Sequence, residues 1–149
     1  MLRTIVNKLV LVALLPFVFA GCDSLFDEGH TERSYDGPPQ VGFFPLEQEV
    51  SDAAGSTTVE VQLIATEHDS DVSVNYSVDT ANSTAVEGEH FTIATGSPVT
   101  LPSGQWTVDV TINLIEGSVD GEVRLDLQID SSSAEVAENF RTARIYIQG

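Results

Sequence analysis

The stretch Val108–Leu114 reads Val-Asp-Val-Thr-Ile-Asn-Leu, with an apolar residue at every second position. Successive side chains of a β-strand point to opposite faces of a sheet, so this alternation predicts a strand with one face in a core and one in water. It places Val110 and Ile112 in the core and Asp109 in solvent. The stretch therefore predicts a half-buried β-strand.

The same period of two recurs along the chain, and no segment keeps the period of 3.6 that indicates a helix. Glycine, serine and acidic residues separate the alternating segments, as is typical of turns. The predicted strands cover Val41–Phe44, Val59–Leu63, Val72–Val78, Pro98–Leu101, Val108–Leu114, Val123–Ile129 and Ala143–Ile147. About seven short antiparallel strands are typical of immunoglobulin-like domains. We therefore predict an all-β, immunoglobulin-like antiparallel β-sandwich over residues 41–149.

Residues 1–21 have the features of a cleaved secretory signal peptide. Arg3 and Lys8 give a positive start, and the apolar run Leu9–Ala20 precedes Gly21 and Cys22. The run is about 12 residues long, shorter than the roughly 20 that a membrane-spanning helix needs. The segment resembles a bacterial lipoprotein signal with its lipobox, which implies cleavage before Cys22 and lipidation of that residue. The alternative is an ordinary secretory signal followed by an incidental cysteine.

Residues 22–40 carry several acidic residues, the pair Pro38-Pro39 and few apolar side chains. Such a segment buries too little apolar surface to offset the entropy of ordering, so we predict a disordered tether between Cys22 and the domain. Its early acids resemble the export signal of Bacteroidota lipoproteins. The resemblance implies an outer-membrane lipoprotein, periplasmic or surface-exposed, whose partner is the membrane through the lipid on Cys22.

The chain is strongly acidic, with 23 acidic and six basic residues. Cleavage would remove Arg3 and Lys8, leaving four arginines, no lysine and a net charge of −19. Such a surface repels nucleic acid and anionic lipid headgroups, so neither is an expected partner. Strong acidity without lysine is also consistent with a halophilic protein, because salt screens the repulsion between carboxylates. The alternative is a generic acidic exported protein.

Short motifs of the predicted domain follow one another in a familiar order. They are Val41-Gly42-Phe43, Val50-Ser51-Asp52, Val72–Ser77, Gly88-Glu89-His90-Phe91, Val99–Gly104 and Thr142–Ile147. This order resembles that of Calx-beta domains and covers nearly all of residues 41–149. Calx-beta domains are immunoglobulin-like sandwiches found in sodium–calcium exchangers, an integrin tail and bacterial surface proteins. The resemblance implies the same fold here.

The resemblance also implies a calcium site. Calcium takes six to eight oxygen ligands, so several carboxylates and carbonyls must converge. Asp52 and Glu116 stand at positions that match the family's ligands, and Glu122 or Asp120 stands near a third. His90 replaces a family aspartate, and the closing acids are missing at the end of the chain. The implied site is therefore degenerate, and the alternative is that these acids are turn and surface residues.

The pattern of histidines and serines does not indicate an enzyme. Nucleophilic catalysis needs a base and an orienting group beside the nucleophile. His30 falls in the predicted tether, His68 in a turn and His90 at the start of a strand, whereas the serines fall in turns and on polar strand faces. No glycine-rich phosphate loop is present. We therefore expect a protein without catalytic activity.

Two functions from different classes remain. The first is a surface interaction or adhesion module that binds a glycan or a surface protein, with Trp106 and Tyr146 as candidate contacts because sugars stack on exposed rings. The second is a calcium-binding structural domain that uses Asp52, Glu116 and Glu122. For Trp106, which precedes a predicted strand, the alternative is a ring that caps the edge of the core.

Overall fold

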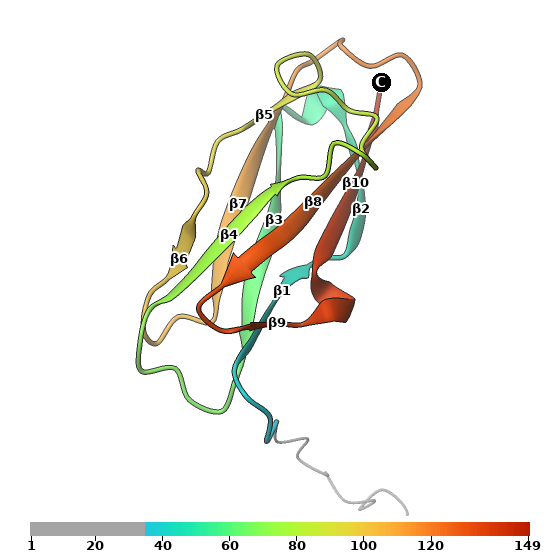
Figure 1. Ribbon diagram of the computed structural model, residues 1–149. Helices are drawn as coiled ribbons and strands as arrows, with labels where there is room; N and C mark the ends of the chain where they lie inside the picture. The colour runs from blue at the N-terminus through green and yellow to red at the C-terminus, as the bar shows by residue number, and fades with distance from the viewer. Residues whose placement is uncertain (1–34) are drawn as a thin grey trace, which may run out of the picture. The chain divides into compact units, whose positions relative to one another are not determined.

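The computed structural model describes residues 35–149, which form two five-stranded sheets packed face to face (Figure 1). The predicted signal peptide, Cys22, His30 and the tether up to residue 34 lie outside the described residues. From residue 35 onward, no helix is long and apolar enough to cross a membrane. The predicted all-β sandwich is confirmed.

Sheet A has the strand order β5-β7-β3-β1-β9, and sheet B has the order β2-β10-β8-β4-β6. The strands are β1 (Gln40–Phe44), β2 (Glu47–Ser51), β3 (Ser56–Ile64), β4 (Val72–Val78), β5 (Phe91–Ile93), β6 (Val99–Leu101), β7 (Thr107–Leu114), β8 (Glu122–Ser132), β9 (Glu135–Val136) and β10 (Thr142–Gln148). Two short 3-10 helices, η2 (Asp52–Ala54) and η3 (Glu138–Phe140), lie in the connections.

The inward faces of the two sheets form the core. Side chains at alternate positions of the long strands are fully buried, as the period of two predicts: Val59 and Val61 in β3, Val110 and Ile112 in β7, Leu125, Leu127 and Ile129 in β8, and Ala143, Ile145 and Ile147 in β10. Each large aliphatic side chain removed from water contributes about 1.5–3 kcal/mol. Apolar packing therefore holds the two sheets together without a disulfide.

The edges of the sheets differ from the prediction. β2, β5 and β9 are additional strands, so residues 35–149 hold ten strands where about seven were expected. Two pairs are parallel: β2 with β10 and β9 with β1. Between β1 and β2 the chain passes from sheet A to sheet B at Pro45 and Leu46. The remaining pairs are antiparallel.

One polar face is less exposed than its alternation predicts. Asp126 has the outward parity of β8, yet its side chain is only 2 % exposed. After β4 ends, the chain continues beside β8, where the Asp79 N–H donates to the Asp126 carbonyl at 2.9 Å. Ser83 Oγ accepts from the Asp126 N–H at 2.9 Å. This loop and Arg144 cover the carboxylate, so the prediction of a fully solvated outer face is wrong at Asp126.

The loops gather at two opposite ends of the sandwich (Figure 1). At the N-terminal end, where residues 35–39 lead into β1, lie the β3–β4 loop (65–71) and the β6–β7 loop (102–106). The C-terminal end carries η2, the β7–β8 loop (115–121) and Gly149. The sites predicted from sequence therefore fall in different places.

Candidate functional site

Trp106 lies at the N-terminal end of the sandwich, directly before β7. Its side chain is 43 % exposed. Its carbonyl accepts a hydrogen bond from the Leu63 N–H at 2.8 Å, which ties the residue to the end of β3. Its ring packs against the His68 ring, with centroids 5.8 Å apart and planes inclined at 54°. Trp106 therefore keeps a substantial exposed surface on a supported ring.

His68 supports this ring from the β3–β4 loop. The imidazole is 8 % exposed, and its Nε2 lies 2.8 Å from the Pro102 carbonyl oxygen. A carbonyl only accepts hydrogen bonds, so Nε2 carries the proton and donates. The His68 carbonyl in turn accepts from the Gly104 N–H at 2.9 Å. His68 is therefore a structural residue that fixes one loop against the other.

Asp71 makes a further contact between these loops. Its Oδ1 accepts from the Ser103 N–H at 2.9 Å. Glu67 and Asp69 lie on either side of His68 in the chain, and both are exposed to solvent. We call Trp106, His68 and their two loops the Trp106 platform. An exposed aromatic ring on a supported loop junction offers a surface on which a ligand can stack.

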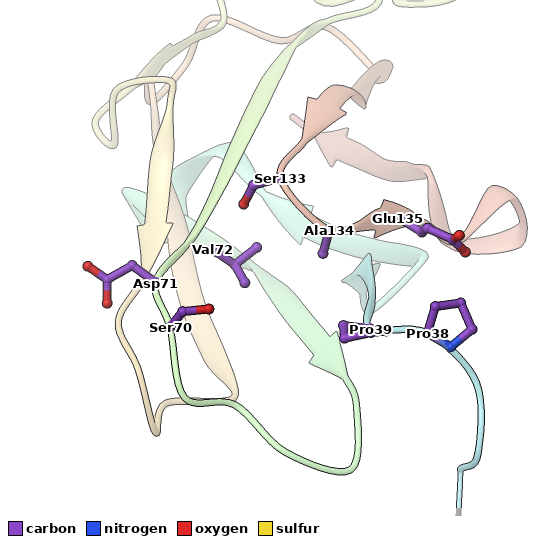
Figure 2. A pocket seen from close by; sticks show the side chains of 8 residues that line it. All are labelled: Pro38, Pro39, Ser70, Asp71, Val72, Ser133, Ala134 and Glu135. Carbon is purple, nitrogen blue, oxygen red and sulfur yellow. The ribbon is translucent and has the colours of Figure 1, made fainter.

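The loop that carries His68 also borders an open hollow of about 370 Å³. Figure 2 shows Val72 and Ala134 between Ser70 and the prolines that precede β1, while the Asp71 carboxylate points away. The residues that line it are Pro38, Pro39, Ser70, Asp71, Val72, Ser133, Ala134 and Glu135. The hollow thus has Val72 and Ala134 in its middle, the two prolines on one side and Ser70 on the other.

Tyr146, the second aromatic candidate, lies elsewhere, on the outer face of sheet B. In β10 it stands between Arg124 of β8 and Glu49 of β2. A hydrogen bond to Asp126, followed by one to Tyr146, raises the pKa of Arg144 above its usual value. Tyr146 is partly buried. The structure therefore does not bring Trp106 and Tyr146 into one binding surface.

Charged side chains surround Tyr146. Arg144 lies 3.1 Å from the Asp126 carboxylate and 3.0 Å from that of Glu47, and Arg124 lies 3.5 Å from Asp126. We call Glu47, Arg124, Asp126 and Arg144 the Arg144 network. The Asp126 carboxylate is buried between two guanidinium groups, which compensates the cost of removing its charge from water. The alternating sequence marks these residues as outward but gives no sign of this burial.

The acids of the calcium hypothesis lie at the C-terminal end of the sandwich. Asp52 is buried in η2, and its Oδ2 accepts from the Val119 N–H at 3.4 Å. Glu116 is exposed, and the Glu122 carboxylate accepts from the Gln148 amide at 2.6 Å. Asp52 thus contacts the loop that carries Glu116. Among residues 35–149, no three His, Cys, Asp or Glu residues lie close enough to hold a metal ion.

His90, which replaces a family aspartate, caps a turn. Its Nδ1 accepts from the Val86 N–H at 2.9 Å, while its carbonyl accepts from the Ile115 N–H at 3.0 Å. Both imidazole rings therefore bond to backbone groups, that of His68 to the β6–β7 loop and that of His90 to its own turn. Neither imidazole is placed as the base of a serine nucleophile.

The chain matches no protein-family model and no curated protein. Among solved structures it is similar to the apo-form Calx CBD1 domain, with a TM-score of 0.64 and 19% identity over 75% of this chain and 97% of that chain. It is also similar to the calcium binding domain CBD12 of CALX1.1, with a TM-score of 0.62 and 21% identity over 72% of this chain and 44% of that chain. The Calx CBD2 domain gives a TM-score of 0.57 at 14% identity. This likeness shows the fold, which is that of a Calx-beta-like β-sandwich.

Proposed function

We propose that this protein is a non-enzymatic, lipid-anchored binding module of a bacterial outer membrane, and that it binds glycans on the Trp106 platform. The observation that carries the proposal is the exposed Trp106 ring packed on buried His68. A large aromatic side chain left in water at a fixed loop junction has no evident role in the core. Ligand stacking gives it one.

The rigidity of the platform suits sugar recognition. A pyranose offers an apolar face of C–H groups, which stacks on an aromatic ring, and hydroxyl groups that bond to carboxylates. Three contacts fix the two loops before any ligand arrives: Nε2 of His68 to Pro102, the carbonyl of His68 to Gly104, and Asp71 to Ser103. A preorganised site loses less conformational entropy on binding. Glu67 and Asp69 place two exposed carboxylates on the loop that carries His68.

Trp106 is the single tryptophan of the chain, so its fluorescence reports binding at the platform directly. The chain from residue 22 with Cys22→Ser, which stays unlipidated, would be titrated with soluble laminarin, xylan and mannan. Binding of one of these should shift the emission of Trp106, and Trp106→Ala should weaken binding at least tenfold by calorimetry. Tyr146→Ala is the matched control and should bind as the unchanged chain does. Equal binding by Trp106→Ala would refute the platform.

The membrane anchor rests on the resemblance of residues 1–22 to a lipoprotein signal. Cys22→Ser in the full-length precursor should abolish incorporation of radiolabelled palmitate, because the thiol that carries the lipid is gone. Labelling that persists in the variant would contradict the anchoring proposal and leave the platform untouched.

Calcium binding at the C-terminal end is the second candidate function. Asp52 favours it, because this buried carboxylate already contacts the β7–β8 loop at Val119. A calcium ion would have to draw Glu116 or Asp120 of that loop toward Asp52. Calorimetric titration with calcium chloride should then give a signal that Asp52→Asn abolishes and Trp106→Ala leaves unchanged. No heat at millimolar calcium would remove this candidate.

A further inference from the structure

β2 is the longest edge strand in the part of the chain that the structure describes. It has five residues, whereas β5 and β6 have three each and β9 has two. It pairs with β10 on one side and lies at the margin of sheet B in Figure 1. Edge strands are commonly kept short, bulged or marked with lysine or proline, because their open backbone groups can pair with another chain. β2 has no bulge, lysine or proline among its five residues, and the charges of Glu47 and Glu49 are its only such protection.

The register of β2 defines which of its backbone groups are open. The Leu46 carbonyl accepts from the Arg144 N–H at 2.8 Å. In a parallel pair the residues of one strand alternate between facing their partner and facing away. Leu46, Gln48 and Val50 therefore turn their N–H and carbonyl groups to β10. Glu47, Glu49 and Ser51 turn theirs to the free edge.

The side chains along this edge favour a basic partner. Glu47, Glu49 and Ser51 are exposed, while Gln48 and Val50 are partly buried. Between residues 41 and 149 the chain has 18 acidic residues against three arginines. Two copies joined edge to edge would bring Glu47 and Glu49 near the glutamates of the other copy, and like charges across strands are destabilising. Glu49, together with Glu47, which also pairs with Arg144 at 3.0 Å, attracts an added strand that carries lysine or arginine.

A hollow at the start of β2 gives the edge a place for one side chain. It measures about 390 Å³ and is lined by Leu46, Glu47, Thr142 and Arg144. Phe44, two residues upstream, leaves 54 % of its surface exposed. A residue that pairs with Glu47 in an added strand would project toward the same face of the sheet. In strand addition, backbone bonds supply affinity and such pockets supply specificity.

We infer that the free edge of β2 binds an extended, basic segment of a partner protein as an additional strand of sheet B. The partner strand carries lysine or arginine at alternate positions opposite Glu47 and Glu49. This inference goes beyond glycan binding and does not depend on it, because the edge and the Trp106 platform share no residue. Trp106→Ala should leave strand addition unchanged.

Amide hydrogen exchange tests the inference on the chain from residue 22 with Cys22→Ser. The probe is a synthetic peptide, Thr-Lys-Val-Lys-Val-Thr, and its control replaces both lysines with glutamate. With the basic peptide, the N–H groups of Glu47, Glu49 and Ser51 should exchange at least tenfold more slowly, and those of β9 should not change. Equal slowing by the acidic peptide, or none by the basic peptide at millimolar concentration, would overturn the inference. Self-association without peptide would also overturn it.

Two variants at one position separate strand addition from charge attraction. Glu49→Pro removes an outward N–H and the charge, and proline is tolerated on an edge strand where its nitrogen faces solvent. Glu49→Thr removes the charge alone and keeps the N–H. Glu49→Thr should weaken binding of the basic peptide severalfold, and Glu49→Pro should weaken it at least tenfold further. Both variants could lose peptide binding to the same extent while hydrogen exchange of the amides between β2 and β10 stays unchanged. That result would mean that the peptide is held by charge attraction alone, and it would refute strand addition.

Discussion

Tyr76 points into the core from β4, and its hydroxyl donates a hydrogen bond to the Thr95 carbonyl. Burial, with the Glu87 charge as a second cause, raises the pKa of Tyr76 above 10.0. The folded state therefore holds the neutral phenol more firmly than the unfolded chain does. This contribution to stability is fully present below pH 10 and is lost as pH rises through the folded pKa.

Tyr76→Phe tests both contributions of this hydroxyl. At pH 7 the variant should lose about 1 kcal/mol of unfolding free energy, because the hydrogen bond to Thr95 is missing. Above pH 10 the unfolding free energy of the unchanged protein should fall faster with pH than that of the variant. The difference in unfolding free energy between the two proteins should therefore shrink as the pH rises. Tyr146→Phe, on the outer face, is the control. A difference in unfolding free energy between Tyr76→Phe and the unchanged protein that stays constant with pH would contradict the raised pKa of Tyr76.

Gly42 is the second residue with a specific steric role. It sits in β1, and a Cβ atom added there would collide with the Cβ of Phe140 in η3. Gly42→Ala should therefore destabilise the domain by about 1–3 kcal/mol through overpacking. Phe140→Gly, which removes that Cβ, should recover part of the loss in the same chain, measured by urea denaturation as a double-mutant cycle. Strict additivity of the two changes would show that Phe140 does not pack over Gly42.

At the scale of the strand, the register of β7 sets a contrast between neighbouring residues. Val110 is fully buried, and Val110→Asp would bury an unpaired carboxylate, at a cost of several kcal/mol. Asp109 is exposed on the opposite face, so Asp109→Asn should change stability by no more than about 0.5 kcal/mol. Chemical denaturation of both variants measures the contrast. An equal loss of unfolding free energy in the two variants would mean that the register of β7 is wrong.

The long strands were predictable from sequence because each has one face in the core. β3, β7, β8 and β10 bury alternate side chains, and their boundaries differ from the prediction by a few residues at most. β2, β5 and β9 left weaker signals, since they are edge strands of two to five residues and β2 carries charges at alternate positions. Tertiary hydrogen bonds, not local patterning, define these edges.

The candidate site was only partly predictable. Trp106 stood out as the single tryptophan, but its support by His68 depends on two loops that meet from more than 30 residues apart in sequence. Asp126 looked solvated because its neighbours alternate, whereas the loop after β4 and the guanidinium groups of Arg124 and Arg144 bury it. The alternation of apolar and polar residues identifies the face of the sheet on which a side chain lies. It does not show whether a segment distant in sequence covers that face.

At the scale of the whole molecule, the excess of negative charge affects thermal stability. With 18 acidic residues against three arginines after residue 40, carboxylates repel one another at low ionic strength. The Debye length falls from about 30 Å at 0.01 M salt to about 3 Å at 1 M. Potassium chloride should therefore raise the thermal midpoint of the chain from residue 22 with Cys22→Ser by about 5 °C or more. Most of the rise should be complete below 1 M.

Calcium provides the discriminating comparison in the same thermal assay. A specific site adds stability at ligand concentrations too low to screen charge. Screening alone predicts that sub-millimolar calcium chloride has no more effect than potassium chloride of equal ionic strength. A thermal midpoint that does not change with potassium chloride but rises with sub-millimolar calcium chloride would favour Asp52 and Glu116 as calcium ligands.

The placement of Trp106 at the same end of the sandwich as residue 35 has a mechanical consequence. If a glycan is held on Trp106 and a lipid on Cys22, a pulling force between them would act on the domain at two points of that same end. The path would run through the β6–β7 loop and β3 into the start of β1, where Gln40 pairs with Ile64. η2, the β7–β8 loop and most of sheet B would carry no load. Such a module would yield by peeling at β1 while the remainder of its core stays folded.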